Sequence, residues 1–351
     1  ELGSAHFCYP GEFVRLQKPK GEYTLRLLGS FYGKRGRGDE SHRFYRLDRG
    51  PNRNNRWPWI ALSVEDQARG LSLIGPPGTG KSQAGILPIA ADSMKAGQSL
   101  IVLDPQGELA PYLLDYARVT GHLVIVHNPS SPEDSCRINL CDWIDNVADA
   151  KAMAAVLLSD AHTYGSSQFW TKSATNLLAA CALHYPSFGE VLDSRQDIQH
   201  MAQGLKDSRI PGVTDLANDF VSSMQSKDPK LGLNIMATAF NIGLAPWADP
   251  AIRSISTHTD LDLAAQMTSL PAVVILRCSR RHMEAYGPYL GTILRVLTTR
   301  LDDIGEAAGG PLPIPVGMIL EEFPVLGRLD SLVRDINLVR KRRISILTAA
   351  Q

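Results

Sequence analysis

The stretch that decides the fold is Leu71-Ser-Leu-Ile-Gly-Pro-Pro-Gly-Thr-Gly-Lys-Ser82. Its first four residues are typical of a short buried strand, and helical spacing follows from Lys81 to about Lys95. Between them the sequence fits G-x-x-x-x-G-K-[ST] at every fixed position. The three glycines let consecutive backbone N–H groups face one anion, and the helix N-terminus adds its positive end. The stretch predicts a nucleotide phosphate site made of Gly75, Pro76, Pro77, Gly78, Thr79, Gly80, Lys81 and Ser82.

Within this site, Lys81 is expected to reach the β- and γ-phosphates, and the Ser82 hydroxyl to ligate Mg²⁺. A glycine- and proline-rich turn without any ligand is the alternative interpretation. The full motif between a strand and a helix argues strongly against that alternative. The sequence therefore predicts ATP and Mg²⁺ as the cofactors.

Strands and helices alternate on both sides of a long helical stretch. Alternation of this kind predicts an α/β fold, a parallel sheet with helices on both faces. The expected strands are 99–104, 123–126, 272–276, 316–320 and 344–347, and the expected helices are 110–119, 288–301 and 329–339.

Residues 144–259 show helical spacing and no convincing buried strand, which predicts an inserted all-helical domain. The expected division is a strand-rich N-terminal segment at 1–70, a nucleotide-binding domain in two parts at 71–143 and 260–351, and the insertion between them. The chain begins at Glu1 and ends just after a strand-like run, so we expect it to be a fragment cut at both ends.

Composition excludes several classes of protein. The chain has 351 residues, 44% hydrophobic and 21% charged, which is typical of a folded globular protein and not of a disordered one. Its apolar runs are far too short for a spanning helix. The five cysteines form no Cys-x-x-Cys pair, which argues against a disulfide framework or a structural zinc site and favours a reducing compartment.

A second acidic site is expected at the end of a neighbouring strand. Val316-Gly-Met-Ile-Leu320 is strand-like and is followed by Glu321 and Glu322. The carboxyl ends of parallel strands are where such sheets bind ligands. Glu321 is predicted to hold Mg²⁺ and Glu322 to activate the attacking water. The alternative is an acid pair that only stabilises the N-terminus of the next helix.

Asp104-Pro-Gln-Gly-Glu108 also follows a predicted strand. Asp104 is therefore a further candidate for the nucleotide site. A Pro-Gly turn explains the proline and the glycine but not the two acids, and both interpretations stay open.

Several segments together resemble the TraG-type coupling proteins of conjugation and type IV secretion, P-loop motors related to the FtsK and HerA translocases. Ile101 to Glu108 resembles an Asp-Pro-Lys-Gly-Glu segment of that family, with Gln106 in place of the lysine. The other matching segments are Gly3-Ser-Ala5, Arg137-Ile-Asn-Leu140, Phe169-Trp170 with the helix after it, and Glu321-Glu-Phe-Pro-Val-Leu-Gly327.

The resemblance implies two further site residues. Arg340 occupies the position of an arginine that acts across a subunit boundary, and Gln351 that of a glutamine that senses the γ-phosphate. This chain reads Arg340-Lys-Arg-Arg343 where the family has a glycine shortly after the arginine, so a neighbour could be the active residue. A solvated basic face or a DNA-contacting patch is the alternative for this cluster.

The resemblance also implies a RecA-like motor in a ring of six subunits at the bacterial inner membrane, facing the cytoplasm. The expected partners are DNA in relaxase–DNA complexes or effector proteins, and inner-membrane components of the secretion system. An N-terminal membrane anchor is expected outside this chain.

Residues 15–56 hold twelve Lys and Arg against four Asp and Glu, with aromatic residues between them. This composition suits single-stranded nucleic acid or anionic headgroups, and a solvated surface is the plain alternative. Two rival functions stay open beside the motor: a receptor platform with weak hydrolysis, for which Glu321 in place of the usual aspartate is the best support, and a DNA translocase outside secretion.

Overall fold

The computed structural model describes residues 25–27, 32–33, 45–46, 60–62, 70–74, 81–159, 168–322 and 341–350. Its centre is a six-stranded sheet in which every pairing is parallel, with the order β5-β10-β9-β6-β8-β7. The strands are β5 (Leu71–Ile74), β6 (Ser99–Leu103), β7 (Leu123–His127), β8 (Ala272–Leu276), β9 (Val316–Glu321) and β10 (Ile344–Ala350).

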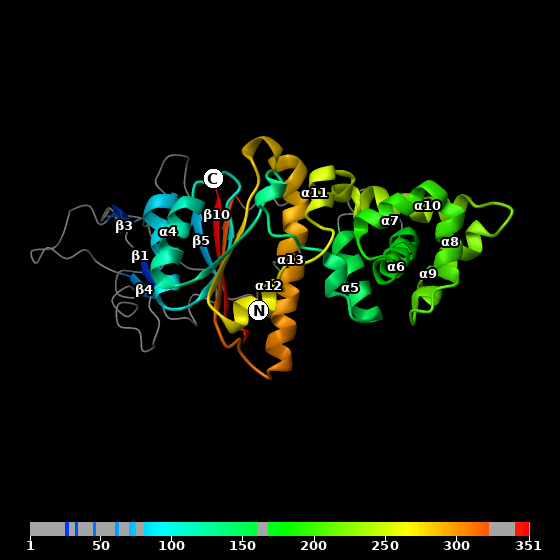
Figure 1. Ribbon diagram of the computed structural model, residues 1–351. Helices are drawn as coiled ribbons and strands as arrows, with labels where there is room; N and C mark the ends of the chain where they lie inside the picture. Colours follow the sequence, from blue (N-terminus) through cyan, green and yellow to red (C-terminus); the bar gives the residue numbers. More distant parts are fainter. Residues whose placement is uncertain are drawn as a thin grey trace, which may run out of the picture.

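Each face of the sheet is covered by its own pair of helices (Figure 1). Leu100, Val102 and Ile275 pack with α3 (Leu87–Lys95) and α4 (Ala110–Thr120). Ile101, Leu103 and Val274 point the other way, toward α12 (Leu263–Ser269) and α13 (Met283–Ala307). Because side chains alternate along a strand, runs that are apolar at every position must be covered on both faces. The predicted α/β fold is confirmed.

The helix predicted from Lys81 to Lys95 begins differently from the expectation. Its first six residues form a π-helical segment, η1 (Lys81–Ile86), and only then does α3 begin. Pro88 has no N–H and cannot donate to the carbonyl four residues earlier, which removes one α-helical hydrogen bond at this junction. π-Helical turns of this kind are frequent at functional sites.

Other element boundaries also differ from the sequence expectation, among them the end of α13, which lies at Ala307 and not at 301. Helix α13 begins at Met283, five residues before the expected start, and carries Pro288 inside it. Pro288 is the sixth residue of α13, so its missing N–H leaves the carbonyl oxygen of Glu284 without its α-helical donor. Strand β10 runs three residues further than expected, and it pairs with β5 on one side and β9 on the other. The expected helix at 329–339 lies outside the described residues.

Between β7 and β8, the described residues contain helices and loops and no strand, as the sequence predicted. Figure 1 shows the helices of residues 147–254, the helical part of the chain, on the far side of α13 from the sheet. The division into domains stays our proposal. The elements are η2 (Pro132–Asp134), η3 (Leu140–Trp143), α5 (Val147–Leu157), α6 (Gln168–His184), α7 (Phe188–Ser194), η5 (Arg195–Asp197), α8 (Ile198–Lys206), α9 (Val213–Met224), α10 (Lys230–Thr238), η6 (Ala239–Gly243), η7 (Ala245–Ala248) and α11 (Pro250–Ser254).

A row of buried rings joins the sheet to the helical part through α13. Tyr289 lies 5.6 Å from the ring of His127 at the end of β7 and 5.5 Å from Trp247 on η7, between ring centroids. Trp247 in turn makes an edge contact with Phe188 on α7 at 5.0 Å. One continuous apolar core therefore runs from the sheet into the helices.

The N-terminal segment contributes four short described strands in two antiparallel pairs. They are β1 (Leu25–Leu27) with β4 (Ile60–Leu62), and β2 (Tyr32–Gly33) with β3 (Tyr45–Arg46). The other residues of the basic stretch 15–56 lie outside the described residues. Among the residues that the structure describes, none of the helices is long and apolar enough to cross a membrane.

Candidate functional site

The candidate site lies at the edge of the sheet where the parallel strands have their carboxyl ends. Glu321 is the last residue of β9, and Asp104 and Arg277 directly follow β6 and β8. Lys81 and Ser82 begin η1, which follows β5 in the chain. The strand order places β9 next to β6, so their terminal acids meet at one place, as expected for ligand sites in open parallel sheets.

The two predicted magnesium ligands are in direct contact. The Ser82 hydroxyl donates a hydrogen bond of 2.6 Å to Glu321 Oε1, although the residues are 239 positions apart in the chain. The other oxygen of this carboxylate, Oε2, is buried and has no hydrogen-bond partner among the described residues. A buried acceptor without a hydrogen-bond donor raises the free energy of the folded chain, so the site is suited to a ligand that supplies positive charge.

The environment of Glu321 disfavours its negative charge. Burial raises the pKa of Glu321 above its ordinary value, while the hydrogen bond from Ser82 acts in the opposite direction. The neighbouring carboxylates of Asp104, Glu108 and Glu322 raise the pKa further. Such a concentration of acids is what a bound cation relieves.

These residues fit Mg²⁺ bound with a nucleotide. Magnesium prefers oxygen ligands and is usually held by one or two protein groups, with phosphate oxygens and waters completing its shell. Ser82 Oγ and Glu321 offer such a pair. Among the described residues no group of three or more His, Cys, Asp or Glu side chains forms a complete cage for a metal. The geometry thus suits a metal that arrives with phosphates.

Glu322, the predicted water-activating residue, has an unusual backbone and a defined partner. Its φ of +52° lies in the left-handed region, which a residue with a Cβ seldom adopts. Its Oε1 accepts a hydrogen bond of 2.5 Å from the Gln106 amide, Nε2. Non-glycine residues in this region are typical of sites where strain is held for function.

Asp104 is completely buried and organises the loop that follows β6. Its Oδ2 accepts hydrogen bonds from the backbone N–H groups of Leu109, at 3.0 Å, and Ala110, at 2.8 Å, at the start of α4. Burial raises the pKa of Asp104, and the N–H groups at the helix start oppose the shift. Its Oδ1 is buried without a partner among the described residues. A nucleotide contact for Asp104 stays a prediction.

Arg277 was not expected from the sequence. It follows the buried strand β8, and its guanidinium lies over Gly107, where an added Cβ would stand 2.7 Å from Nη2. Its positive charge also acts on Asp104. The sequence feature that could have identified Arg277 is its position directly after a fully apolar strand. Gln106 was noted only as a departure from a family pattern, and its contact with Glu322 had no local signal.

The arginine cluster is only partly described. Arg342 Nε donates 2.6 Å to Asp302 Oδ1 on α13, and Arg342 is mostly buried. It precedes β10, at the edge of the sheet opposite to Glu321. An ion pair inside the fold therefore occupies Arg342, which favours another member of the cluster for any role between subunits. Arg340, Gln351 and the loop residues Gly75–Gly80 lie outside the described residues, so their roles stay predictions.

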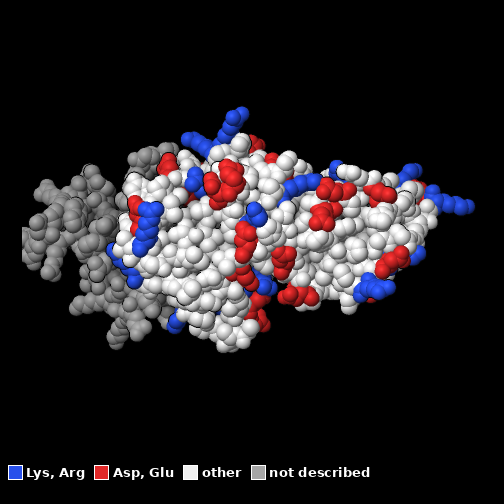
Figure 2. Space-filling model, in the orientation of Figure 1, with Lys and Arg blue, Asp and Glu red and all other residues white. Residues whose placement is uncertain are grey.

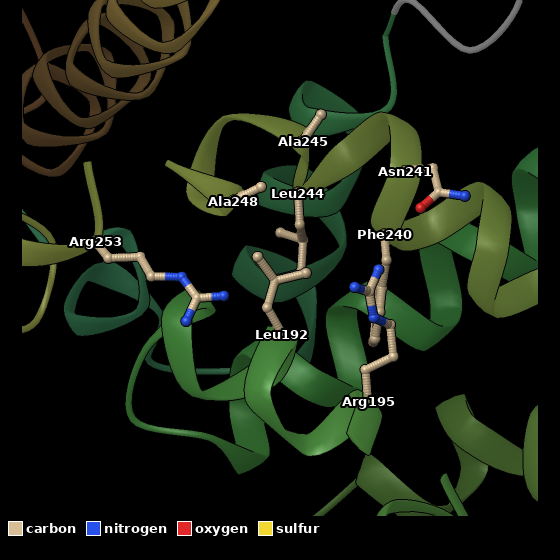
Figure 3. Close-up of a pocket in the computed structure, with 8 residues that line it drawn as sticks. All are labelled: Leu192, Arg195, Phe240, Asn241, Leu244, Ala245, Ala248 and Arg253. Atoms are coloured by element: carbon tan, nitrogen blue, oxygen red, sulfur yellow. The ribbon is translucent and has the colours of Figure 1, made fainter. Parts of the chain in front are cut away.

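A separate cavity of about 360 Å³ lies in the helical part. Figure 3 shows the side chains of Leu192 and Leu244 between the guanidinium groups of Arg253 and Arg195, with Phe240 on the side of Arg195. Arg253 is already engaged, because it donates to Asp193 and to the carbonyl oxygen of Trp247, both at 2.7 Å. None of the residues predicted for the nucleotide site lines this cavity.

The parallel sheet, the G-x-x-x-x-G-K-[ST] sequence between β5 and η1, and the contact between Ser82 and Glu321 define a P-loop nucleotide-binding protein of the RecA-like class. The family described as type IV secretory system conjugative DNA transfer matches residues 52–351 of this chain, and the chain belongs to that family.

One curated relative is a probable conjugal transfer protein TraG from Sinorhizobium fredii, strain NBRC 101917 / NGR234. It is 24% identical over 257 residues, which are 67% of this chain and 38% of the relative. The chain therefore spans well under half of the length of that protein.

Solved structures of the plasmid coupling protein TrwB share the fold. The form with the non-hydrolysable ATP analogue ADPNP has a TM-score of 0.60 at 15% identity, covering 99% of this chain and 74% of that one. The form with ADP and Mg²⁺ has a TM-score of 0.57 at 14% identity and covers 83% of this chain and 65% of that one. These likenesses confirm the predicted fold, a RecA-like sheet with an all-helical part.

Proposed function

We propose that this chain is the motor part of a conjugative coupling protein that binds ATP with Mg²⁺ and hydrolyses it. The observation that carries the proposal is the 2.6 Å hydrogen bond between Ser82 and Glu321. It brings together the two side chains predicted to hold the metal, one from the phosphate-binding motif and one from the end of β9.

The residues divide the work as follows. The backbone of Gly75–Gly80 and the Lys81 ammonium hold the phosphates, and Ser82 and Glu321 hold Mg²⁺, which neutralises charge on the transferred phosphoryl group. Glu322 accepts the proton of the attacking water. Arg340, by resemblance, completes the site from a neighbouring subunit, and Gln351 senses the γ-phosphate.

The cargo and setting follow from the family. We propose that the protein recruits DNA in relaxase complexes, or protein effectors, and passes them to a secretion channel from the cytoplasmic face of the bacterial inner membrane, as a hexameric ring. Conjugative relatives support this proposal over a translocase outside secretion. On the face shown in Figure 2, basic and acidic side chains of the helical part are interspersed, which suits protein contacts better than DNA backbone.

The test is ATP hydrolysis by the full chain, measured with and without single-stranded DNA. We expect turnover that rises with DNA. Lys81→Ala should lower it by at least about 100-fold, the scale of losing one preorganised group that stabilises transition-state charge. Lys95→Ala is the matched control, because this exposed lysine ends the helix that follows η1 and forms a surface ion pair with Asp92 at 3.9 Å.

The receptor platform predicts a different result. Tight ATP binding without turnover, unchanged by DNA, would contradict the motor. Glu321→Asp would then be the informative variant, because an aspartate at this position shortens the metal ligand by one methylene.

A further inference from the structure

The loop between β6 and α4 is held firmly at three points. The Asp104 carboxylate binds the N–H groups at the start of α4. The Asp104 N–H donates 2.9 Å to the carbonyl oxygen of Leu276, which ties the loop to β8. Gly107 adopts a φ of +72° beneath the Arg277 guanidinium. Gln106, between the first and third of these points, is therefore presented in a defined direction.

Gln106 is directed at Glu322 across the two central strands. Strand β6 pairs with β9 with Leu103 opposite Leu320, so the residues beyond these two positions meet at the same edge. There Gln106 Nε2 donates to Glu322 Oε1 at 2.5 Å. The backbone of Glu322 is left-handed, a conformation that a residue with a Cβ seldom adopts and that is typical of functional sites.

We propose that Gln106 is a positioning residue for hydrolysis, which fixes the Glu322 carboxylate toward the site of the attacking water. This inference rests on the proposed ATP hydrolysis and names the group that orients its base. A carboxylate has about four acceptor sites, so the bond from Gln106 to Oε1 leaves capacity for a water proton. The amide is neutral and its nitrogen is not basic, so Gln106 orients the base without competing for the proton of the water.

The chemistry of the contact predicts an order among three variants of residue 106. Gln106→Lys keeps a donor of similar reach and should retain kcat within about threefold. Gln106→Ala removes the donor and should lower kcat by about 10- to 100-fold, the range expected for lost orientation of a general base. Gln106→Glu has the same shape but places an acceptor against Glu322, and should lower kcat at least as far. KM for ATP should change less than threefold in all three, because none of the predicted phosphate or metal contacts is altered.

The matched control is Gln203→Ala. Gln203 Nε2 on α8 donates a hydrogen bond of 2.6 Å to Asp207, the residue after this helix, which is an exposed amide–carboxylate contact of the same kind away from the site. We expect wild-type kcat and KM for this variant. Equal kcat for wild type, Gln106→Ala and Gln106→Glu would overturn the inference, as would a loss that appears in KM alone.

A structural measurement completes the test and does not depend on turnover. In a crystal structure of nucleotide-free Gln106→Ala, the Glu322 carboxylate should leave its wild-type orientation, while Ser82 and Glu321 stay in contact. An unchanged Glu322 would overturn the inference even if activity falls. The proposed function fails separately, when wild type shows no hydrolysis or Lys81→Ala retains it.

Discussion

Glu321 differs by one methylene from the aspartate that the family resemblance leads one to expect. The structure shows which atoms the longer side chain reaches. Ser82 Oγ reaches Glu321 Oε1 at 2.6 Å, and the second oxygen lies buried beside other acids. A longer ligand on a strand end can therefore still meet the hydroxyl of the phosphate-binding motif, which is why we favour a working metal site over a disabled one.

His127 is a buried histidine whose hydrogen bonds can all be made by a neutral ring. Nδ1 lies 2.7 Å from the carbonyl oxygen of Cys136, so it must donate, and Nε2 accepts from the Tyr289 hydroxyl at 3.1 Å. Complete burial lowers the pKa of His127 to about 4 from an ordinary value of 6.5. Charging this ring would place an unpaired cation in the core.

The stability of the fold should therefore fall in mild acid. Between about pH 6.5 and pH 4 the unfolded chain binds a proton at His127 that the folded chain does not, so the free energy of unfolding decreases as pH falls. The contribution is at most about 3 kcal/mol. Urea unfolding at pH 7.5 and pH 5 should show a smaller loss for His127→Gln than for wild type. An equal loss in both proteins would contradict the assignment.

At the scale of elements, the β6–α4 loop can be tested by two glycines with nearly the same φ angle. Gly107 has φ +72° and Arg277 above it, whereas Gly121, after α4, has φ +74° and open space around an added Cβ. Gly121→Ala should cost about 1 kcal/mol of unfolding free energy, from the left-handed conformation alone. Gly107→Ala should cost more, because the guanidinium must also move.

The two glycine variants also distinguish an effect on stability from an effect on catalysis. Only Gly107→Ala should lower kcat for ATP, since only that loop carries Gln106. Urea unfolding and steady-state kinetics on both variants make the comparison. If Gly107→Ala costs no more stability than Gly121→Ala and leaves kcat unchanged, the loop is not the rigid support that the geometry indicates.

Most helices and strands could be predicted from the sequence, and the main errors concern where two helices begin. Runs that are apolar at every position, such as Ala272–Leu276, identify strands covered on both faces. The helix starts that differ from the sequence expectation lie near prolines. The sequence places the start of α13 at Pro288, yet the helix begins at Met283, and Tyr286 and Gly287 before the proline are buried. The effect of Pro88 on η1 likewise depends on hydrogen-bond geometry and not on residue pattern.

At the scale of the whole molecule, the sheet and the helical part share one apolar core. The ring of Tyr289 on α13 contacts His127 of the sheet and Trp247 of the helical part. Trp247 and Tyr289 are among the largest fully buried side chains of the described residues. The helical part is therefore packed on the sheet through α13 and is not tethered by a linker alone, so a change at the end of β7 would be felt in the helices.

The residues of the candidate site could be predicted where a short sequence motif identifies them. Lys81, Ser82, Glu321 and Glu322 follow from a motif and from acids after a strand. Gln106 and Arg277 did not follow, because their roles depend on the strand order that places β6 between β9 and β8. No local pattern encodes that order, which arises from the packing of the complete sheet.

The central claim is that Ser82 and Glu321 form the metal end of an ATP site. The most direct measurement is a crystal structure of the full chain with Mn²⁺ and a non-hydrolysable ATP analogue, in which anomalous scattering locates the metal. We predict the metal bonded to Ser82 Oγ at about 2.1 Å, the distance typical of Mg²⁺ ligands, bound to Glu321 directly or through one water, with the triphosphate on Lys81. A metal or a triphosphate bound elsewhere, with the Ser82–Glu321 hydrogen bond intact, would contradict the claim.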